Sequence, residues 1–501
     1  MPNKTLVKLT GISKSFAGVR ALQGIDLEIK EGEVHCLAGG NGCGKSTMIK
    51  IISGFYQPDK GTIEIDGKVY PHLNPQQAID LGIQVIYQDF SVFPNLTVAE
   101  NIALSAERLD GKKFVNWKRV RERAQEALDM INVDIDLDAI LADLPVASKQ
   151  LVAICRSLLQ NAKVLIMDEP TTALTKNEVK SLFKVVRDLQ KKGISVVFVS
   201  HKIEEVYEIA ERLSIFRNGK KVIEGPIQEF DRKKFVYYMT GREIETEQFI
   251  PKNRAKEPLL EVQNIGITDL FKDISFKLYP GEILGITGLL GSGRSELAKS
   301  LLNLEKITEG KILLEGKELK TDSVKNAINA GIAYVPEDRL TEGLFMPQTI
   351  SRNMIAAVIE RNLNKLTLID DAGVRERSLK WVEELKVKTP HTQLPVQALS
   401  GGNQQKVVIA KWLSTDPKVL ILNSPTVGID VGAKADIYDY TRKLADSGMG
   451  VIIISDDIPE VIDNCNRVLV MKQGRITREL ETSGLEEDTL SDILVDAGKE
   501  G

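Results

Sequence analysis

A glycine-rich stretch near the start of the chain has the residue types and spacing that bind a phosphate chain. This first phosphate loop comprises Gly39, Gly40, Asn41, Gly42, Cys43, Gly44, Lys45, Ser46 and Thr47. Glycines let successive backbone N–H groups turn inward around an anion. Lys45 supplies a cation for the terminal phosphates, and the Ser46 hydroxyl is placed to bind Mg²⁺. The stretch therefore predicts a site for ATP or a similar nucleotide with its magnesium ion.

The residues around the first phosphate loop fit the loop of nucleoside triphosphatases, which joins a strand to a helix. An apolar run over residues 34–38 predicts the strand. Apolar residues at 48, 49, 51 and 52 predict one face of the helix. The N-terminus of that helix adds free N–H donors and a favourable dipole for the phosphates.

A second group of chemically useful side chains follows three buried strands. The strand over residues 164–167 ends in Asp168 and Glu169, and a dry strand does not carry charge at its tip without a use. We expect Asp168 to bind Mg²⁺ and Glu169 to act as the general base that orients the attacking water. Gln88 follows the strand over 83–87 and can reach the metal and the water. His201 follows the strand at 196–200 and could contact the γ-phosphate.

Two other places in the sequence could contact the nucleotide. Phe16 could stack on adenine, and the alternative that it is a core residue stays open. Ser400, Gly401 and Gly402 precede a helix predicted over residues 405–413. A hydroxyl and flexible backbone at a helix N-terminus form a second receptor for an anion.

Composition excludes several classes of protein. The 501 residues include 66 basic and 70 acidic side chains, and the net charge of −4 gives no argument for a nucleic-acid partner. No apolar run approaches the roughly 18 residues that span a bilayer, and we expect no signal peptide. The four cysteines, at 36, 43, 155 and 465, are scattered, which argues against disulfides or a zinc site and suits a reducing compartment.

The chain contains a diverged internal repeat with an offset of about 250 residues. Three pairs of segments match: 32–65 with 281–314, 163–168 with 418–423, and 195–200 with 450–455. We expect a first domain over 1–243, a linker over 244–258 and a second domain over 259–501. The repeated unit places a second phosphate loop at residues 288–296, including Gly288, Gly293, Arg294 and Ser295.

The order of elements predicts an α/β fold in each copy. Short β-branched runs alternate with amphipathic helical stretches, which is typical of a mostly parallel sheet flanked by helices. Alternating segments at residues 6–9 and 260–262 predict an antiparallel β subdomain in each copy. Helical stretches over 116–131 and 375–385 lie between the loop motifs and predict a helical subdomain.

Together these motifs resemble the ATP-binding-cassette (ABC) family over nearly the whole chain. The resemblance implies tandem ABC-type P-loop NTPase domains in which two cassettes stack head to tail. Each ATP would then lie between the phosphate loop of one cassette and the signature segment of the other. The signature segment of the second copy is residues 399–405, which contain Ser400, Gly401 and Gly402.

Finer features resemble the ATP-binding subunits of bacterial monosaccharide importers for ribose, galactose, xylose and related sugars. These features are the tandem arrangement, the second phosphate loop, and the segments 335–339 and 399–407. The resemblance implies a peripheral protein at the cytoplasmic face of the inner membrane. It also implies membrane permease subunits, met by segments such as 89–96 and 340–349, and an extracytoplasmic solute-binding protein.

Other functions stay open at this point. An importer ATPase for nucleosides, or for a furanose-like quorum signal, has the same architecture. A ribosome-associated tandem ABC protein also has two cassettes, but usually with a long charged linker and both carboxylate pairs. The sequence does not identify the solute or the permease. It also does not determine whether cassettes pair within one chain or between two.

The two predicted ATP sites are unequal, because the second copy has lost groups that the first retains. Asn423 and Ser424 replace the carboxylate pair, and Asp456 stands where the first copy has His201. Arg294 replaces the loop lysine, and Glu337 lies near the place of Gln88. The signature segment of the first copy, residues 144–148, lacks the serine and both glycines. We therefore expect one competent site, and a second that binds nucleotide weakly or statically.

Overall fold

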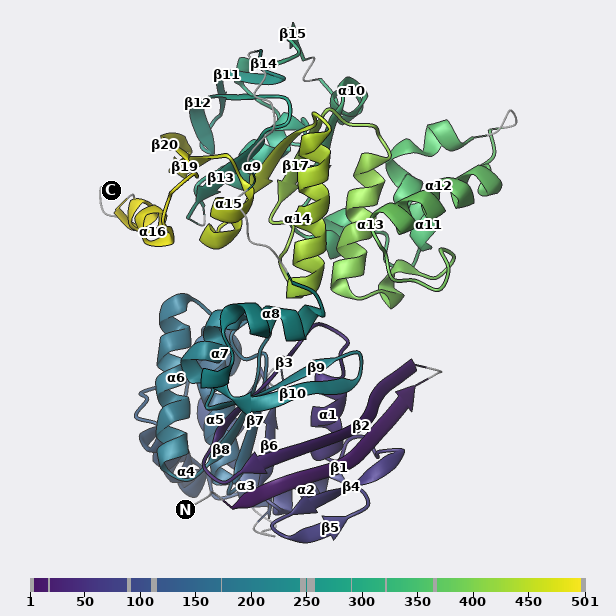
Figure 1. The fold of residues 1–501 in the computed structure, drawn as a ribbon. Helices are drawn as coiled ribbons and strands as arrows, with labels where there is room; N and C mark the ends of the chain where they lie inside the picture. The colour runs from purple at the N-terminus through teal and green to yellow at the C-terminus, as the bar shows by residue number, and fades with distance from the viewer. Residues whose placement is uncertain are drawn as a thin grey trace. The chain divides into compact units, whose positions relative to one another are not determined.

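The chain divides into two compact units, Met1–Ile244 and Glu245–Gly501 (Figure 1). The computed structural model describes residues 4–16, 19–87, 92–109, 115–172, 174–243, 249, 257–289, 291–319, 322–363 and 367–496. Both units combine a mostly parallel sheet, a small antiparallel sheet and a group of helices, so the predicted α/β fold with its two subdomains is confirmed.

The first unit contains ten strands and ten helical segments among its described residues. The strands are β1 (Thr5–Phe16), β2 (Val19–Lys30), β3 (Val34–Gly39), β4 (Lys60–Ile65), β5 (Lys68–Tyr70), β6 (Ile83–Ile86), β7 (Val164–Asp168), β8 (Ser195–Val199), β9 (Arg212–Arg217) and β10 (Lys220–Pro226). The helices are α1 (Lys45–Ile52), α2 (Pro75–Asp80), α3 (Val98–Leu109), α4 (Trp117–Met130), η1 (Leu141–Asp143), α5 (Val146–Leu159), α6 (Lys176–Lys191), α7 (Ile203–Ile209), η2 (Ile227–Glu229) and α8 (Arg232–Thr240).

The central sheet of the first unit has the order β10-β9-β3-β8-β7-β6. Every neighbouring pair from β9 to β6 is parallel, and only β10 is antiparallel. Strands β3 and β8 are buried along their whole length, and apart from His35 and Ser195 their residues are apolar or glycine, as expected for a parallel sheet covered on both faces. The first phosphate loop, the carboxylate pair and His201 therefore all follow carboxyl ends of neighbouring parallel strands.

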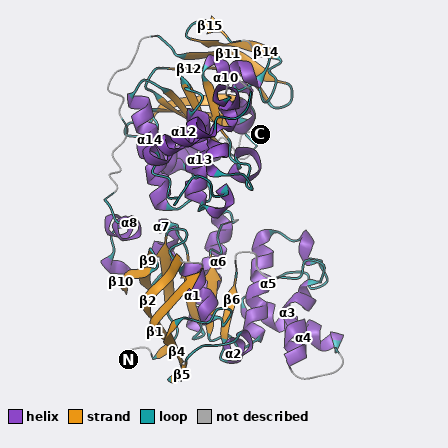
Figure 2. Ribbon diagram, turned by 90° about the vertical axis from the view of Figure 1, so that its right-hand side faces the viewer, coloured by secondary structure: helices purple, strands orange, loops and turns teal. Residues whose placement is uncertain are grey.

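Two smaller layers complete the first unit. Strands β2-β1-β4-β5 form the antiparallel sheet, whose inward residues share a core with α1 and the central sheet. Helices α3, α4 and α5 pack on one another, and they lie to the side of the central strands in Figure 2. Asn116 caps α4 by accepting a hydrogen bond from the Arg119 N–H at 3.2 Å, so the helix predicted over 116–131 starts where expected.

The described residues of the second unit form the same order of strands, with small differences in the short helices. The strands are β11 (Leu260–Ile267), β12 (Phe271–Leu278), β13 (Ile283–Gly288), β14 (Glu309–Leu314), β15 (Lys317–Glu318), β16 (Ile332–Val335), β17 (Val419–Asn423), β18 (Gly450–Ile454), β19 (Arg467–Lys472) and β20 (Arg475–Glu481). The helices are α9 (Arg294–Leu301), α10 (Val324–Ala330), η3 (Arg339–Gly343), α11 (Ile350–Ile355), η4 (Ala356–Asn362), α12 (Asp371–Glu384), η5 (Val396–Ala398), α13 (Gly401–Leu413), α14 (Val431–Asp446), α15 (Ile458–Asn464) and α16 (Glu487–Asp496).

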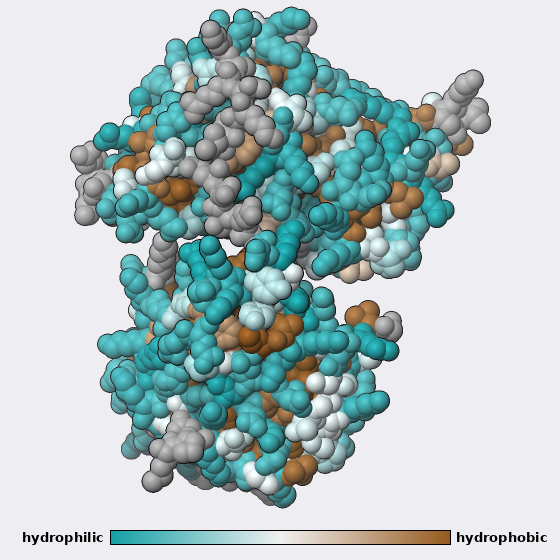
Figure 3. Space-filling view, in the orientation of Figure 1, coloured by the Kyte–Doolittle hydropathy of each residue, from teal (hydrophilic) through white to brown (hydrophobic). Residues whose placement is uncertain are grey.

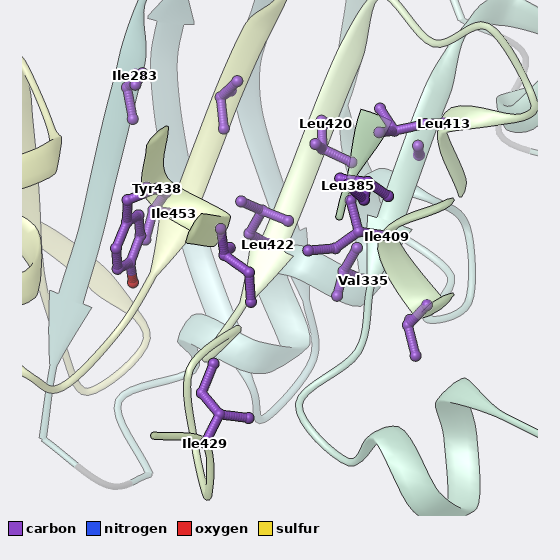
Figure 4. Packing of buried hydrophobic residues seen from close by; sticks show 14 of the residues in the cluster. Ile283, Val335, Leu385, Ile409, Leu413, Leu420, Leu422, Ile429, Tyr438 and Ile453 are labelled. Carbon is purple, nitrogen blue, oxygen red and sulfur yellow. The ribbon is translucent and has the colours of Figure 1, made fainter. Parts of the chain in front are cut away.

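The second unit repeats the strand order of the first, as β16-β17-β18-β13-β19-β20 and β12-β11-β14-β15. Its core lies between the central sheet and the helices. Figure 4 shows Leu420 and Leu422 of β17 among Leu385, Ile409 and Leu413 of the helical side. Phe249, in the segment expected to link the units, is buried in this same core, and its carbonyl accepts a hydrogen bond from the Asn466 amide at 2.7 Å.

Two predicted helix starts are too late. The helix expected over residues 375–385 begins at Asp371. The helix expected over residues 405–413 begins at Gly401, so Gly401 and Gly402 form its first turn. Ser400 takes the N-cap position with an extended backbone, and its hydroxyl accepts a hydrogen bond from the Asn403 side chain at 2.8 Å. Glycine has a low intrinsic helix propensity, which the N-cap and tertiary packing override here.

The surface carries hydrophobic side chains in small patches among hydrophilic ones on the face shown in Figure 3. No helix in the described parts of the chain has both the length and the apolar character needed to cross a membrane.

Ile166 provides a test of the core of the first unit. It is fully buried on β7 and belongs to the cluster that joins the central sheet to the antiparallel sheet. We expect Ile166→Ala to lower the free energy of unfolding of this unit by about 2–5 kcal/mol, because it leaves a cavity. The measurement is urea unfolding of the full chain. Val69→Ala, at a mostly exposed position, is the control and should change the free energy by less than about 0.5 kcal/mol. Equal effects of the two changes would contradict the assignment of this core.

Candidate nucleotide site

The first phosphate loop connects β3 to α1 and turns sharply where its glycines require it. Gly44 is the N-cap of α1 with φ 110°, and a Cβ there would lie 2.6 Å from the Leu22 side chain. Gly39 ends β3 with φ 153°, and a Cβ would lie 2.4 Å from the Phe216 carbonyl oxygen. Side chains are excluded at both ends of the loop, which keeps its backbone N–H groups accessible to an anion.

Lys45 places its cation inside the first phosphate loop. The residue is 5% exposed, and its Nζ donates hydrogen bonds to the carbonyl oxygens of Gly39 at 2.6 Å and Gly40 at 3.1 Å. Its hydrogen bonds go to neutral carbonyls, and the carboxylates of Asp168 and Glu169 act on it through their charge. An anion in the loop would compensate this charge, so the geometry fits a phosphate group.

Asp168 and Glu169 end β7 beside the loop, and their carboxyl groups have opposite pKa shifts. Burial, together with the charge of Glu169, raises the pKa of Asp168 above its usual value, although Lys45 and the Ser46 hydroxyl act in the other direction. Burial also acts to raise the pKa of Glu169, but a hydrogen bond from His201 and nearby cations outweigh it and lower that pKa. Glu169 is therefore ionised at neutral pH, as a general base must be.

His201 contacts the carboxylate of Glu169. The distance from His201 Nδ1 to Glu169 Oε1 is 3.0 Å. Because an ionised carboxylate only accepts, Nδ1 carries the proton and donates it. This contact leaves Nε2 of the same ring to face another group, such as the γ-phosphate predicted from the sequence.

A buried carboxylate that the sequence analysis missed connects the segments carrying these residues. Glu205 Oε2 accepts hydrogen bonds from the hydroxyls of Thr171 at 2.7 Å and Ser200 at 2.8 Å. Its other oxygen lies 3.0 Å from the Lys202 ammonium. Thr171 follows Glu169 by two residues and Ser200 precedes His201, so Glu205 fixes the two strand ends relative to each other. The sequence shows acidic residues just after His201, but it does not indicate which side chains they bind.

The structure does not place two of the predicted site residues, Gln88 and Phe16, at the nucleotide. Gln88 lies outside the described residues, as do residues 89–91 of the expected permease contact. Phe16 ends β1 with 38% of its surface exposed, and its ring contacts Tyr56 with centroids 5.1 Å apart. Phe16 is thus neither fully buried nor free, and stacking on adenine stays a prediction.

The donor set of the first unit fits ATP and also fits Mg²⁺. No group of three or more His, Cys, Asp or Glu residues that could hold a metal occurs in the described parts of the chain. Proteins usually bind Mg²⁺ through one or two carboxylates together with the phosphates of the nucleotide. Ser46 and Asp168, hydrogen-bonded to each other, are the oxygen ligands available next to Lys45.

The second phosphate loop has the same backbone but different chemistry. Gly293 caps α9 with φ 91°, and Arg294 donates a hydrogen bond to the Gly288 carbonyl oxygen. A second nitrogen of Arg294 lies 3.5 Å from a carboxylate oxygen of Asp456. Asn423, buried at the end of β17, donates to the hydroxyls of Tyr334 at 3.2 Å and Ser295 at 3.4 Å.

The signature segments of the two units also differ. At the start of α13, a Cβ on Gly401 would lie 2.8 Å from a guanidinium nitrogen of Arg339. A Cβ on Gly402 would lie 2.4 Å from the Cβ of Ala433. The start of α5 in the first unit has Pro145 at the N-cap, followed by Val146 and Ala147. Pro145 lacks a backbone N–H, so this helix start is a poorer receptor for an anion.

Comparison with known proteins identifies the family. A family described as ABC transporter matches residues 22–172 and 271–427, which together make up more than half of the chain. The chain belongs to the ABC transporter family. One matched region lies in each unit, and the match in the first unit includes the first phosphate loop.

Curated relatives match this ABC protein along almost its whole length. The ribose import ATP-binding protein RbsA of Clostridium perfringens (strain 13 / Type A) is 41% identical over 494 residues, covering 98% of each chain. RbsA 1 of Rubrobacter xylanophilus is 42% identical over 482 residues, covering 95% of each chain. RbsA of Caldanaerobacter subterraneus subsp. tengcongensis is 38% identical over 492 residues, covering 98% of this chain and 99% of the relative.

The raised pKa of Asp168 predicts that this carboxylate destabilises the ATPase without ligand. Because the folded state holds the proton more tightly than the unfolded chain, the cost of ionisation is present above the folded pKa and is lost as the pH falls through it. We expect Asp168→Asn to raise the unfolding temperature of the ligand-free chain at pH 8 by about 2–4 °C. The gain should shrink as the pH is lowered.

Asp66→Asn is the matched control for this pH dependence. Asp66 is exposed, and hydrogen bonds from Lys4 and Lys163 lower the pKa of its carboxyl, so its contribution has the opposite sign. Thermal unfolding at pH 8, 7, 6 and 5 compares the two variants. A lower unfolding temperature for Asp168→Asn at pH 8, or a gain independent of pH, would contradict the analysis.

Glu205 is predicted to be a positioning residue. We expect Glu205→Gln to lower kcat for ATP by about 10- to 100-fold, because Lys202 loses its partner and the hydroxyls of Thr171 and Ser200 lose a charged acceptor. KM for ATP should change little, because the phosphate loop is untouched. Glu204→Gln, a change at an exposed neighbour paired with Arg232, should leave both constants near their original values. A rise in KM with unchanged kcat would refute the positioning role.

Proposed function

We propose that this ABC ATPase is the energy-coupling subunit of an importer for a simple sugar. The observation that carries the proposal is the likeness to ribose import ATP-binding proteins over 98% of both chains at 41% identity. The likeness includes both cassettes, so it extends to the tandem architecture. The partners are membrane permease subunits, and through them an extracytoplasmic solute-binding protein. The chain then acts at the cytoplasmic face of the inner membrane.

Hydrolysis is assigned to the first cassette. Bound ATP supplies the phosphoanhydride bond to be broken, and Mg²⁺ neutralises charge on its phosphates. Lys45 and the N–H groups of the first phosphate loop would hold the phosphate oxygens, while Ser46 and Asp168 would hold the metal. Glu169 takes the proton from the attacking water. His201 keeps that carboxylate ionised and oriented through its hydrogen bond at 3.0 Å, and Gln88 completes the predicted set.

The second cassette contributes its signature segment rather than chemistry. Ser400, Gly401 and Gly402 at the start of α13 keep the small side chains that let a phosphate approach a helix N-terminus. Ser424, which replaces the general base, cannot accept a proton at neutral pH. We infer that cassettes pair head to tail, so that the complete phosphate loop faces the complete signature and one ATP is hydrolysed per pair.

Reconstitution tests the proposed sugar uptake. The chain, its permease subunits and its solute-binding protein are assembled in lipid vesicles with ATP on the side of the ATPase. Uptake of labelled ribose, galactose, xylose and a nucleoside is compared. ATP-dependent accumulation of a monosaccharide supports the proposal. If only the nucleoside is taken up, the proposed substrate is wrong, and the solute is a nucleoside instead. If the chain does not associate with any permease, the transport role is refuted.

The assignment of hydrolysis to one site is tested by a matched pair of substitutions. We expect Glu169→Gln to lower the ATPase rate of the assembled transporter by about 10²- to 10⁴-fold, because the general base is lost. Ser424→Ala, at the equivalent place in the second cassette, should change the rate by less than about twofold. A large loss from Ser424→Ala, or a small one from Glu169→Gln, would contradict the assignment.

A further inference from the structure

We propose that the second phosphate loop binds its nucleotide without magnesium, and so takes a free nucleoside di- or triphosphate as a polyanion. This inference rests on the proposed function, since it assumes that both cassettes of the chain meet nucleotide. It concerns how the second cassette compensates the phosphate charge, which the loss of a catalytic base alone does not determine.

The magnesium ligands of the first cassette are not reproduced in the second. Asp168 offers an anionic oxygen that accepts a hydrogen bond from the Ser46 hydroxyl. At the equivalent place, Asn423 donates its N–H₂ to the Ser295 hydroxyl at 3.4 Å. The serine oxygen that would face a metal therefore faces a hydrogen-bond donor. Mg²⁺ binds anionic oxygens and loses water reluctantly, so this residue set does not fit it.

A tyrosine occupies the side of the site where the first cassette is apolar. Tyr334 on β16 pairs with Ile421, and the corresponding pair in the first unit is Val85 with Ile166. Tyr334 is 2% exposed, and its hydroxyl holds the Asn423 amide at 3.2 Å. Burial raises the pKa of Tyr334 to about 12, so the hydroxyl stays neutral and supplies no negative charge for a cation.

The charges of the second site are already balanced by a pair of side chains. Arg294 lies 3.5 Å from Asp456, whose side chain is 69% exposed. In the first cassette, Lys45 faces two carboxylates, those of Asp168 and Glu169. A metal entering the second site would find the carboxylate of Asp456 already paired with a guanidinium, and the neutral amide of Asn423 where the first cassette has Asp168. The carboxylates of Glu296, Glu337 and Glu342 lie near enough to act on Tyr334 through their charge.

The receptor for an anion is nevertheless retained. The strand β13, the turn at Gly291 with φ 79° and the eight-residue helix α9 repeat the first loop (Figure 1). Arg294 is 8% exposed, and its guanidinium offers five donors in a planar fork that suits phosphate oxygens. Two of its nitrogens already contact Asp456 and the Gly288 carbonyl oxygen, so the phosphate chain would take the remaining donors or displace Asp456.

Two buried polar atoms at the second loop lack a partner within the described structure. They are the Ser292 hydroxyl, in the loop itself, and the Asn423 side-chain oxygen, next to Ser295. Their residues are 4% and 1% exposed. Unpaired buried polar groups are rare and costly. The Ser292 hydroxyl can donate a hydrogen bond to a phosphate oxygen, whereas the Asn423 oxygen only accepts and needs a donor such as water.

The test isolates each loop in the full-length chain. Lys45→Ala removes the principal cation of the first loop, and Arg294→Ala removes that of the second. Binding of radiolabelled ATP is measured by equilibrium dialysis in excess Mg²⁺ and in excess EDTA. We expect Kd for the Lys45→Ala chain to change by less than about threefold on chelation, whereas the Arg294→Ala chain should lose more than about tenfold in affinity.

Restoring the carboxylate provides the reverse experiment. Asn423→Asp, added to Lys45→Ala, should make ATP binding at least about tenfold tighter with Mg²⁺ than with EDTA. Circular dichroism checks the folding of each variant. If the Asn423→Asp chain does not fold, the chelation series on Lys45→Ala decides alone.

Each outcome bears on one claim. Loss of ATP from the Lys45→Ala chain in EDTA would overturn the metal-free site, and so would the absence of binding in both conditions. Neither result would affect sugar uptake by the assembled transporter, which tests the proposed function separately. Failure of uptake together with metal-independent ATP binding by the Lys45→Ala chain would leave the second site standing and remove only the transport role.

Discussion

The hydrogen bond from the Glu169 amide to the Val199 carbonyl oxygen, 3.0 Å long, holds the turn on which the first site depends. Glu169 has φ 48°, a left-handed conformation that costs a non-glycine residue about 1–3 kcal/mol. The turn points the carboxylate along the edge of the sheet toward His201. Ser424 has the same turn, with φ 46°, and its backbone N–H donates a hydrogen bond to the Ile454 carbonyl oxygen at 2.8 Å. The second unit therefore has the same left-handed backbone at this position, although it lacks the carboxylate.

The buried glutamates Glu205 and Glu460 show the same separation of scaffold from chemistry. Glu205 accepts hydrogen bonds from Thr171, which follows β7, and from Ser200, which follows β8. Glu460 accepts them from Thr426, which follows β17, and from Ser455, which follows β18. Burial raises the pKa of Glu460, so the second unit retains a costly group. Its role there is structural, because Ser424 stands in place of the carboxylate that is the proposed general base of the first unit. Connections between strand ends are kept in both units, while the carboxylate pair is kept in one.

Sequence spacing predicted whatever is local in this chain. The first phosphate loop, the carboxylates after β7 and the repeat all follow from short patterns within one strand and one turn. The contact of His201 with Glu169, the hub at Glu205 and the pairing of Arg294 with Asp456 were not predictable. Each includes a contact between residues far apart in the sequence, namely Glu169 with His201, Thr171 with Glu205, and Arg294 with Asp456. The distances across these contacts depend on the register of neighbouring strands. The start of α13 was placed too late because glycine propensity was weighed without the packing of Gly401 and Gly402 against Arg339 and Ala433.

The losses in the two units are complementary, which argues against simple decay of one cassette. The first unit has Lys45, Ser46, Asp168, Glu169 and His201 around its phosphate loop. However, it has Val146 and Ala147 at the start of α5, where the second unit has glycines. The second lacks its carboxylate pair but retains both glycines at the start of α13, where a side chain would collide with its surroundings. Random decay would remove features of one unit without regard to the other. A chain that keeps one complete phosphate loop and one complete signature segment instead has the composition expected when selection acts on a single hydrolytic site.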